Sequence, residues 1–201
     1  MKKEVILNVP QSWGEVTLGN YQKYVATSES KEPTDVIYNT ISSFCNVSTD
    51  IVKRFKLEDL KKVYNSLNKL IKVEPNKSLI NKIELDGVTY GVHPQLDSMT
   101  FGEYVDIEEF TKENIGGFHK VLAVLYRPIT EEKKGKYNIE PYDTKHQDNA
   151  EKFKRVNMDV VNGLTVFFYG LGSKCLLSFQ ASIEGAGIVA KSQEPTGGLV
   201  S

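Results

Sequence analysis

The stretch Thr17-Leu18-Gly19-Asn20-Tyr21 has a second copy with the same Thr-x-Gly-x-Tyr pattern, Thr100-Phe101-Gly102-Glu103-Tyr104. Each copy follows an alternating apolar run, a proline and a few further residues, and the two runs are Val5–Val9 and Ile83–Val92. A threonine at this place predicts a helix N-cap, because its side-chain oxygen can accept a free amide of the first turn. In the second copy Glu103 completes a capping box with Thr100. The repeat therefore predicts one strand-loop-helix unit used twice.

This repeat, with the helical spacing of most other apolar residues, predicts an α+β fold that is predominantly α-helical. Two small antiparallel β elements are expected, each leading into a helical unit. We expect the first unit at residues 1–78, the second at 79–183 and a flexible C-terminal tail at 184–201. An aromatic side chain just beyond a cap can bury a large apolar area. The residues expected to act as such interior anchors are Trp13, Tyr21, Phe101 and Tyr104.

Two local patterns add detail to the expected units. The stretch Leu57–Ile71 is strongly amphipathic, and core packing is a simpler interpretation of its apolar stripe than a groove for a partner. Asp86-Gly87 stands between alternating apolar residues, which predicts a β-hairpin. The later stretch Phe118–Tyr126 has helical spacing, and Pro128 is expected to end that helix.

The segment Thr130–Asp148 is polar and lacks periodicity, so we expect an exposed loop. Within it Tyr137, Ile139 and Tyr142 are candidate partner-binding residues, because apolar side chains in a polar loop can become ordered on a partner.

The closing stretch Ala150–Ile183 is helical in pattern, and its most apolar part is Val160–Phe179. That length nearly spans a bilayer, but Asn162 and Lys174 are among the polar residues that interrupt it. A buried helix or helix pair is therefore expected, and no association with a membrane.

The composition excludes several classes of function. The 201 residues include 25 basic and 26 acidic side chains, so no long-range field attracts nucleic acid or an anionic membrane. Cys45 and Cys175 are too few for a disulfide scaffold, and two buried thiols in a reducing cytosol are expected. The start Met1-Lys2-Lys3-Glu4 lacks the features of a signal peptide.

The sequence offers little catalytic chemistry. His93, His119 and His146 lack a partner at metal-ligand spacing, and His119 is expected to be a packed or hydrogen-bonded core residue. The helix dipole is sufficient to explain the acidic residues between Glu103 and Glu109. We therefore predict no catalytic, cofactor-binding or metal-binding residues and no enzymatic activity. An enzyme with a site assembled only by the fold is the remote alternative.

Three stretches carry a family resemblance: residues 9–22, which begin Val-Pro-Gln-Ser-Trp-Gly-Glu-Val-Thr-Leu-Gly, residues 99–110, which begin Met-Thr-Phe-Gly-Glu-Tyr, and the helical stretch 119–129. They resemble small morphogenesis proteins of tailed bacteriophages, most of all tail assembly chaperones and small tail or baseplate assembly proteins. The resemblance covers roughly residues 1 to 180 in layout. It implies a non-enzymatic protein that holds another tail or virion protein, such as the tape-measure protein, in an assembly-competent state in the cytoplasm of the infected host cell, with homo-oligomers possible.

An alternative of another class shares the phage origin. A structural component, such as a head-tail connector, an internal ring protein or a tail subunit, would remain in the finished virion. The sequence does not distinguish this component from a chaperone, and mass spectrometry of purified particles would.

Overall fold

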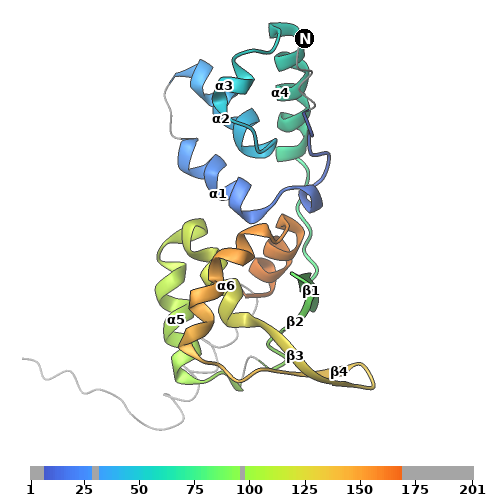
Figure 1. Cartoon of the computed structure of the whole chain (residues 1–201), viewed down its shortest axis with the longest axis vertical. Helices are drawn as coiled ribbons and strands as arrows, with labels where there is room; N and C mark the ends of the chain where they lie inside the picture. Colours follow the sequence, from blue (N-terminus) through green and yellow to red (C-terminus); the bar gives the residue numbers. More distant parts are fainter. Residues whose placement is uncertain (1–6, 29–31, 96–97, 169–201) are drawn as a thin grey trace, which may run out of the picture.

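The computed structural model of the chain describes residues 7–28, 32–95 and 98–168. It is a predominantly helical α+β protein with one four-stranded antiparallel sheet, so the expected fold class is confirmed. In Figure 1 a helical lobe of α1 to α4 lies above a second lobe that holds the sheet and the remaining helices.

The helical lobe begins with a short 3-10 helix, η1 (Trp13–Glu15). It continues with α1 (Leu18–Thr27), α2 (Pro33–Phe44), α3 (Thr49–Val52) and α4 (Leu57–Ile71). Pro33 at the first turn of α2 suits a position whose amide has no helical partner. Among the described residues, the centre of this lobe buries Ile41, Phe44, Leu60, Leu67 and Leu70. Core packing of the α4 stripe is thus confirmed at its centre, whereas Leu57 at its start is 69% exposed.

The second lobe begins with the strands β1 (Lys82–Leu85) and β2 (Val88–Val92), followed by α5 (Phe101–Thr111). Next come η3 (Asn114–Gly117), α6 (Phe118–Leu125), β3 (Tyr126–Lys133) and β4 (Lys136–Ile139). The 3-10 segment η4 (Thr144–Arg155) and an α-helix at 158–168 complete the described chain. The expected helix at Ala150–Ile183 thus begins in 3-10 form, and residues 169–183 lie outside the described part.

The sheet has the strand order β1-β2-β3-β4. Asp86 and Gly87, with φ of 55° and 75°, form the predicted turn between β1 and β2, so this hairpin is confirmed. Gly91 in β2 makes room for the Tyr137 ring of β4, because a Cβ at this position would lie 2.3 Å from the ring. The Tyr137 side chain therefore lies across the sheet and covers β2.

The two lobes are joined by main-chain bonds. Thr17 and Asn157 form an isolated antiparallel bridge. The Leu18 amide donates to the Val156 carbonyl and the Met158 amide to the Val16 carbonyl, each at 2.8 Å. The start of α1 is thereby held against the segment between η4 and the helix at 158–168. The division into units at 1–78 and 79–183 stays a prediction, and these bonds show that the described parts on either side of it are in contact.

The expected first β element is wrong over its described part. Residues 7–9 of the Val5–Val9 run form no strand. A strand needs a neighbour for its main-chain groups, and no strand pairs with this segment in the described structure. Leu7 and Val9 instead pack as half-buried side chains against the core.

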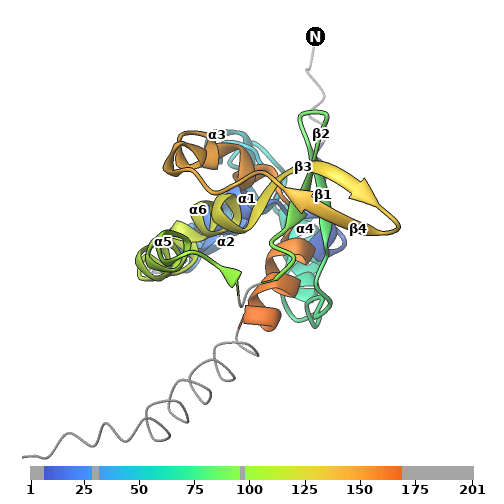
Figure 2. The same cartoon turned by 90° about the horizontal axis from the view of Figure 1, so that it is seen from below.

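The expectation of a loop at Thr130–Asp148 is also wrong. This segment contains the second half of β3, all of β4 and the start of η4. The β3-β4 hairpin extends away from the body, as Figure 2 shows, so both of its faces meet solvent near the tip. Because the outer half of β3, residues 130–133, is exposed and has no apolar residue, this part of the sequence resembles a loop. Its turn is Lys134-Gly135, with φ of 52° and 76°.

Candidate functional site

The N-terminus of α5 carries a complete capping box. The Thr100 Oγ1 accepts a hydrogen bond from the Glu103 amide at 3.3 Å, and Glu103 Oε2 accepts one from the Thr100 amide at 2.6 Å. The Thr100 hydroxyl also donates to Oε2, at 2.8 Å. The predicted caps at Thr100 and Thr17 are both confirmed. The box leaves the second carboxylate oxygen of Glu103 available for a different partner.

That partner is Arg127 in β3. Its Nη2 lies 2.6 Å from Glu103 Oε1, and the residues are 3% and 2% exposed. His93, which follows β2, places Nε2 3.7 Å from the same oxygen. Taking two charges out of water is costly, and removing one partner of such a pair is strongly destabilising. The pair therefore ties α5 to the sheet at a fixed position.

Tyr142 covers this pair from the segment between β4 and η4. The Arg127 Cζ lies 5.8 Å from the centre of the Tyr142 ring, a cation–π arrangement. The Tyr142 hydroxyl donates a hydrogen bond to Asp106 Oδ2, one turn along α5 from Glu103. The hydrogen bond fixes α5 to the segment after β4, so Asp106 has a structural partner.

The pKa shifts in this cluster follow from burial and charge. Burial acts to raise the pKa of the Glu103 carboxyl, but the bonds from Thr100 and the charges of Arg127 and His93 outweigh it and hold that pKa below its usual value. Burial lowers the pKa of His93, against the opposing effect of Glu103. Burial likewise lowers the pKa of Arg127. The arrangement favours a charged Glu103 beside a neutral His93.

The opposite side of α5 is apolar and exposed. Phe101, Tyr104 and Val105 are 83%, 56% and 38% exposed and have the i, i+3, i+4 spacing of one helix face. We call these three residues the α5 face. In Figures 1 and 2 α5 lies at the edge of the second lobe, with α6 on its inner side. The expected interior packing of Phe101 and Tyr104 is therefore wrong, because the Glu103 and Ile107 side of the helix faces the core. Trp13 and Tyr21 are half-buried, and the centres of their rings lie 5.8 Å apart.

The α5 face continues into acidic residues. Glu108 and Glu109 are exposed in the second half of the helix. No ion pair links either of them to another side chain in the described ranges. The first turn of α5 thus places a carboxylate inside the protein and aromatic rings outside, the reverse of the usual amphipathic arrangement, whereas further along the helix Ile107 is buried and Glu108 and Glu109 are exposed. Large apolar side chains grouped on an exposed face are typical of an interaction surface.

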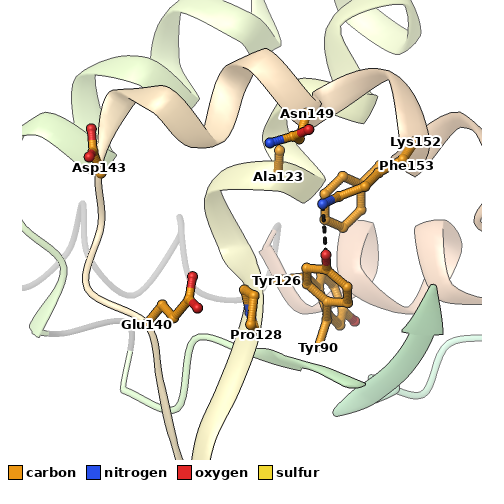
Figure 3. A pocket seen from close by; sticks show the side chains of 9 residues that line it. All are labelled: Tyr90, Ala123, Tyr126, Pro128, Glu140, Asp143, Asn149, Lys152 and Phe153. Atoms are coloured by element: carbon orange, nitrogen blue, oxygen red, sulfur yellow. Dashed lines mark hydrogen bonds between the residues drawn. The ribbon is translucent and has the colours of Figure 1, made fainter. Parts of the chain in front are cut away.

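A separate pocket of about 290 Å³ lies between the sheet, α6 and η4 (Figure 3). Lys152 Nζ donates to the Tyr90 hydroxyl at 2.7 Å and lies 4.9 Å from the centre of that ring. In the view of Figure 3 the carboxylates of Glu140 and Asp143 lie on the side away from this lysine. The lysine is already engaged by the aromatic side chains, so we assign the pocket no chemistry of its own.

The three predicted partner-binding residues do not lie together on one loop. Tyr137 donates its hydroxyl hydrogen bond within the sheet, with the carbonyls of Val92 at 2.9 Å and Asn81 at 3.1 Å as acceptors. Ile139 is half-buried in β4. Tyr142 belongs to the Glu103 cluster. Their role in binding a partner stays a prediction, and each already has a structural role or setting in this fold.

Two other predictions have clear outcomes. His119 is confirmed as a hydrogen-bonded core residue: it is 6% exposed, and its Nδ1 lies 3.3 Å from Gln22 Nε2 of α1. Cys45 is buried as expected, whereas Cys175 and the side chain of His146 lie outside what is described. Sequence reasoning missed Arg127. The available signal was an arginine directly after the apolar stretch Phe118–Tyr126, where an unpaired charge is unfavourable.

Within the described ranges, no group of three or more His, Cys, Asp or Glu residues could hold a metal ion. Over the same ranges, no helix is long and apolar enough to cross a membrane. Comparison with known proteins found no matching family, no matching curated protein and no matching solved structure.

Proposed function

We propose that this chain is a non-enzymatic bacteriophage assembly protein, a tail assembly chaperone that binds another tail protein such as the tape-measure protein in the cytoplasm of the host cell. The resemblance of residues 9–22, 99–110 and 119–129 to phage morphogenesis proteins supports the phage origin. The observation that carries the binding role is the α5 face, an apolar surface held outward by a buried ion pair. A chaperone requires such a surface, because it must cover apolar segments of its client until assembly.

Co-expression tests this function. The full-length chain is produced together with the tape-measure protein of the same genome, and the soluble yield and co-purification of that protein are measured. A chaperone raises the soluble yield of its client and co-purifies with it. A co-expressed helical protein of similar size and charge is the control for non-specific effects. Failure to bind the tape-measure protein or any other tail protein would contradict the proposal.

A structural virion component is the second candidate, and the β3-β4 hairpin favours it. This arm extends from the body, and β4 is an edge strand of the sheet. Exposed edge strands can pair with a neighbouring subunit, as in closed rings. Mass spectrometry of purified particles separates the two candidates: stoichiometric amounts in the virion support the component, and absence supports the chaperone.

A further inference from the structure

We infer that the α5 face is the docking surface for a basic amphipathic helix of the partner protein. This inference rests on the proposed binding function and adds the place and the chemistry of the contact. It starts from the first turn of α5, where the acidic side chain is buried and the aromatic one is not: Glu103 is 2% exposed and Phe101 is 83% exposed. Such a helix leaves apolar area in water that a partner could cover.

The α5 face is rigid before any partner binds. The capping box fixes the first turn, the Arg127 pair fixes Glu103, and Tyr142 holds Asp106. A preorganised surface loses little conformational freedom on binding, so more of its contact energy appears as affinity. A mobile apolar loop would lack this advantage.

The shape of the surface fits a helix. Phe101, Tyr104 and Val105 form the i, i+3, i+4 ridge that packs into the groove of a second helix. Gly102 beside them is exposed, and a Cβ there would meet only the Tyr142 ring at 3.9 Å. The backbone at this point is therefore open to close approach by a partner.

The charge around the α5 face selects the partner. Glu108 and Glu109 extend the surface and have no ion pair within the described structure. A second copy would bring these carboxylates close to their own equivalents, which is unfavourable when symmetric faces meet. The chain's own residues 169–201 carry two lysines, Lys174 and Lys191, and two glutamates, Glu184 and Glu194, so they offer no net positive charge. Lysine or arginine residues flanking an apolar stripe on another protein complement the surface.

A peptide titration tests the inference on the full-length chain. The probe is a synthetic fluorescent helical peptide with leucines at i, i+3, i+4 and i+7 and lysines on both flanks, and the measurement is fluorescence anisotropy. Matched peptides carry glutamate in place of lysine, or serine in place of leucine. We expect the lysine peptide to bind at least about 10-fold more tightly than either control. Equal binding of the glutamate peptide would overturn the charge argument.

Variants then locate the contact. Phe101→Ser with Tyr104→Ser should weaken binding of the lysine peptide by about 10-fold or more, and Glu108→Lys with Glu109→Lys should weaken it and remove its dependence on salt. Leu57→Ser, at the exposed start of α4, is the matched control and should leave binding unchanged. Circular dichroism and thermal melting establish that every variant is folded. Unchanged binding by the Phe101/Tyr104 variant, or equal loss in the Leu57 control, would overturn the inference.

The remaining outcomes separate this inference from the proposed function. If sedimentation shows a dimer that the Phe101/Tyr104 variant loses, the occupant is a second copy and the inference is wrong. If the parent and this variant bind the tape-measure protein equally well, the function stands and the docking surface is wrong. If no tail protein binds but the lysine peptide binds selectively at the α5 face, the docking surface stands and the proposed function fails.

Discussion

Helices α1 and α5 begin with the same Thr-x-Gly-x-Tyr pattern, but the residue after the threonine is buried in one helix and exposed in the other. In α1 the residue after the capping threonine, Leu18, is fully buried, and in α5 the equivalent Phe101 is 83% exposed. The third helical position differs as well: Asn20 in α1 is half-buried, whereas Glu103 in α5 is fully buried and paired with Arg127. The comparison shows that a cap fixes where a helix starts, whereas its neighbours fix which side faces the core.

The neighbours differ in a simple way. The start of α1 lies against η4, where the Leu18 amide bonds to Val156 and a Cβ on Gly19 would come within 3.2 Å of Lys154. The start of α5 is held on one side by the ion pair between Glu103 and Arg127 of β3, and on its other side Phe101 and Tyr104 face solvent. The shared Thr-x-Gly-x-Tyr pattern thus begins one helix that is packed against the second lobe and another that holds side chains in solvent.

The largest expected effect on stability concerns the buried ion pair between Glu103 of α5 and Arg127 of β3. Arg127→Met leaves Glu103 as an unpaired buried charge, and we expect the free energy of unfolding to fall by about 3–5 kcal/mol in urea titrations. The double variant Glu103→Leu with Arg127→Met removes both charges and should lower the free energy of unfolding by less than Arg127→Met alone. Asn20→Ala at the equivalent position of α1 should change it by about 0.5 kcal/mol or less. Similar values for Arg127→Met and Asn20→Ala would contradict the contrast between the helices.

The next effect compares the first residues of the two helices. Leu18→Ala removes a fully buried side chain, and the expected loss of unfolding free energy is about 2–5 kcal/mol. Phe101→Ala removes an exposed ring, so the change should stay within about 0.5 kcal/mol. Differential scanning calorimetry on both variants measures the contrast. A large loss in Phe101→Ala would show that this ring is covered in the protein in solution.

A smaller effect of opposite sign is expected at the paired glycines. Gly102→Ala adds a methyl group to an open helical position, which should raise the free energy of unfolding by about 0.4–1 kcal/mol. Gly19→Ala gains the same helix propensity but crowds the Lys154 backbone oxygen at 3.2 Å, so it should be less favourable. Urea titrations of both variants measure the difference. Equal stabilisation would show that the contact between α1 and η4 is loose.

The mildest test is pH. His119, beside α1, and His93, beside α5, both have pKa values below the usual 6.5, mainly because of burial, so the unfolded chain takes up protons first and stability falls as the pH drops below that value. Glu103 has a pKa below its usual 4.5, and its contribution is lost as the pH falls through that lowered value. Unfolding measured at about pH 7.5, 5.5 and 3.5 should show both steps.

Variants assign these steps to the two helices. His119→Gln should remove the part of the upper step that comes from the side of α1 and leave the part from His93, and Glu103→Gln should flatten the lower step at α5. An unchanged profile in Glu103→Gln would mean that its carboxylate does not stabilise the fold through the pair with Arg127.

Local signals in the sequence were sufficient for several elements. The two N-caps, the capping box and the Asp86-Gly87 turn depend on residues within three positions of each other, and all are confirmed. The strand at Val5–Val9 was predicted from alternation, which is a weaker signal because a strand also requires a partner. The β3-β4 arm was missed for the complementary reason: the strands do pair, but the exposed outer half of β3 has no apolar residue and β4 alternates over only four residues.

By itself, then, the sequence determined the helical character of the protein, the starts of its capped helices and the turn between β1 and β2, because these follow from bonds between near neighbours in the chain. Only the tertiary structure decided which side of α5 is buried. Arg127 is separated from Glu103 by α6 along the chain, and their pairing depends on how α6 packs on α5 and leads into β3. That long-range contact draws a carboxylate inward and leaves Phe101 and Tyr104 in solvent, because the two sides of one helix cannot both face the core.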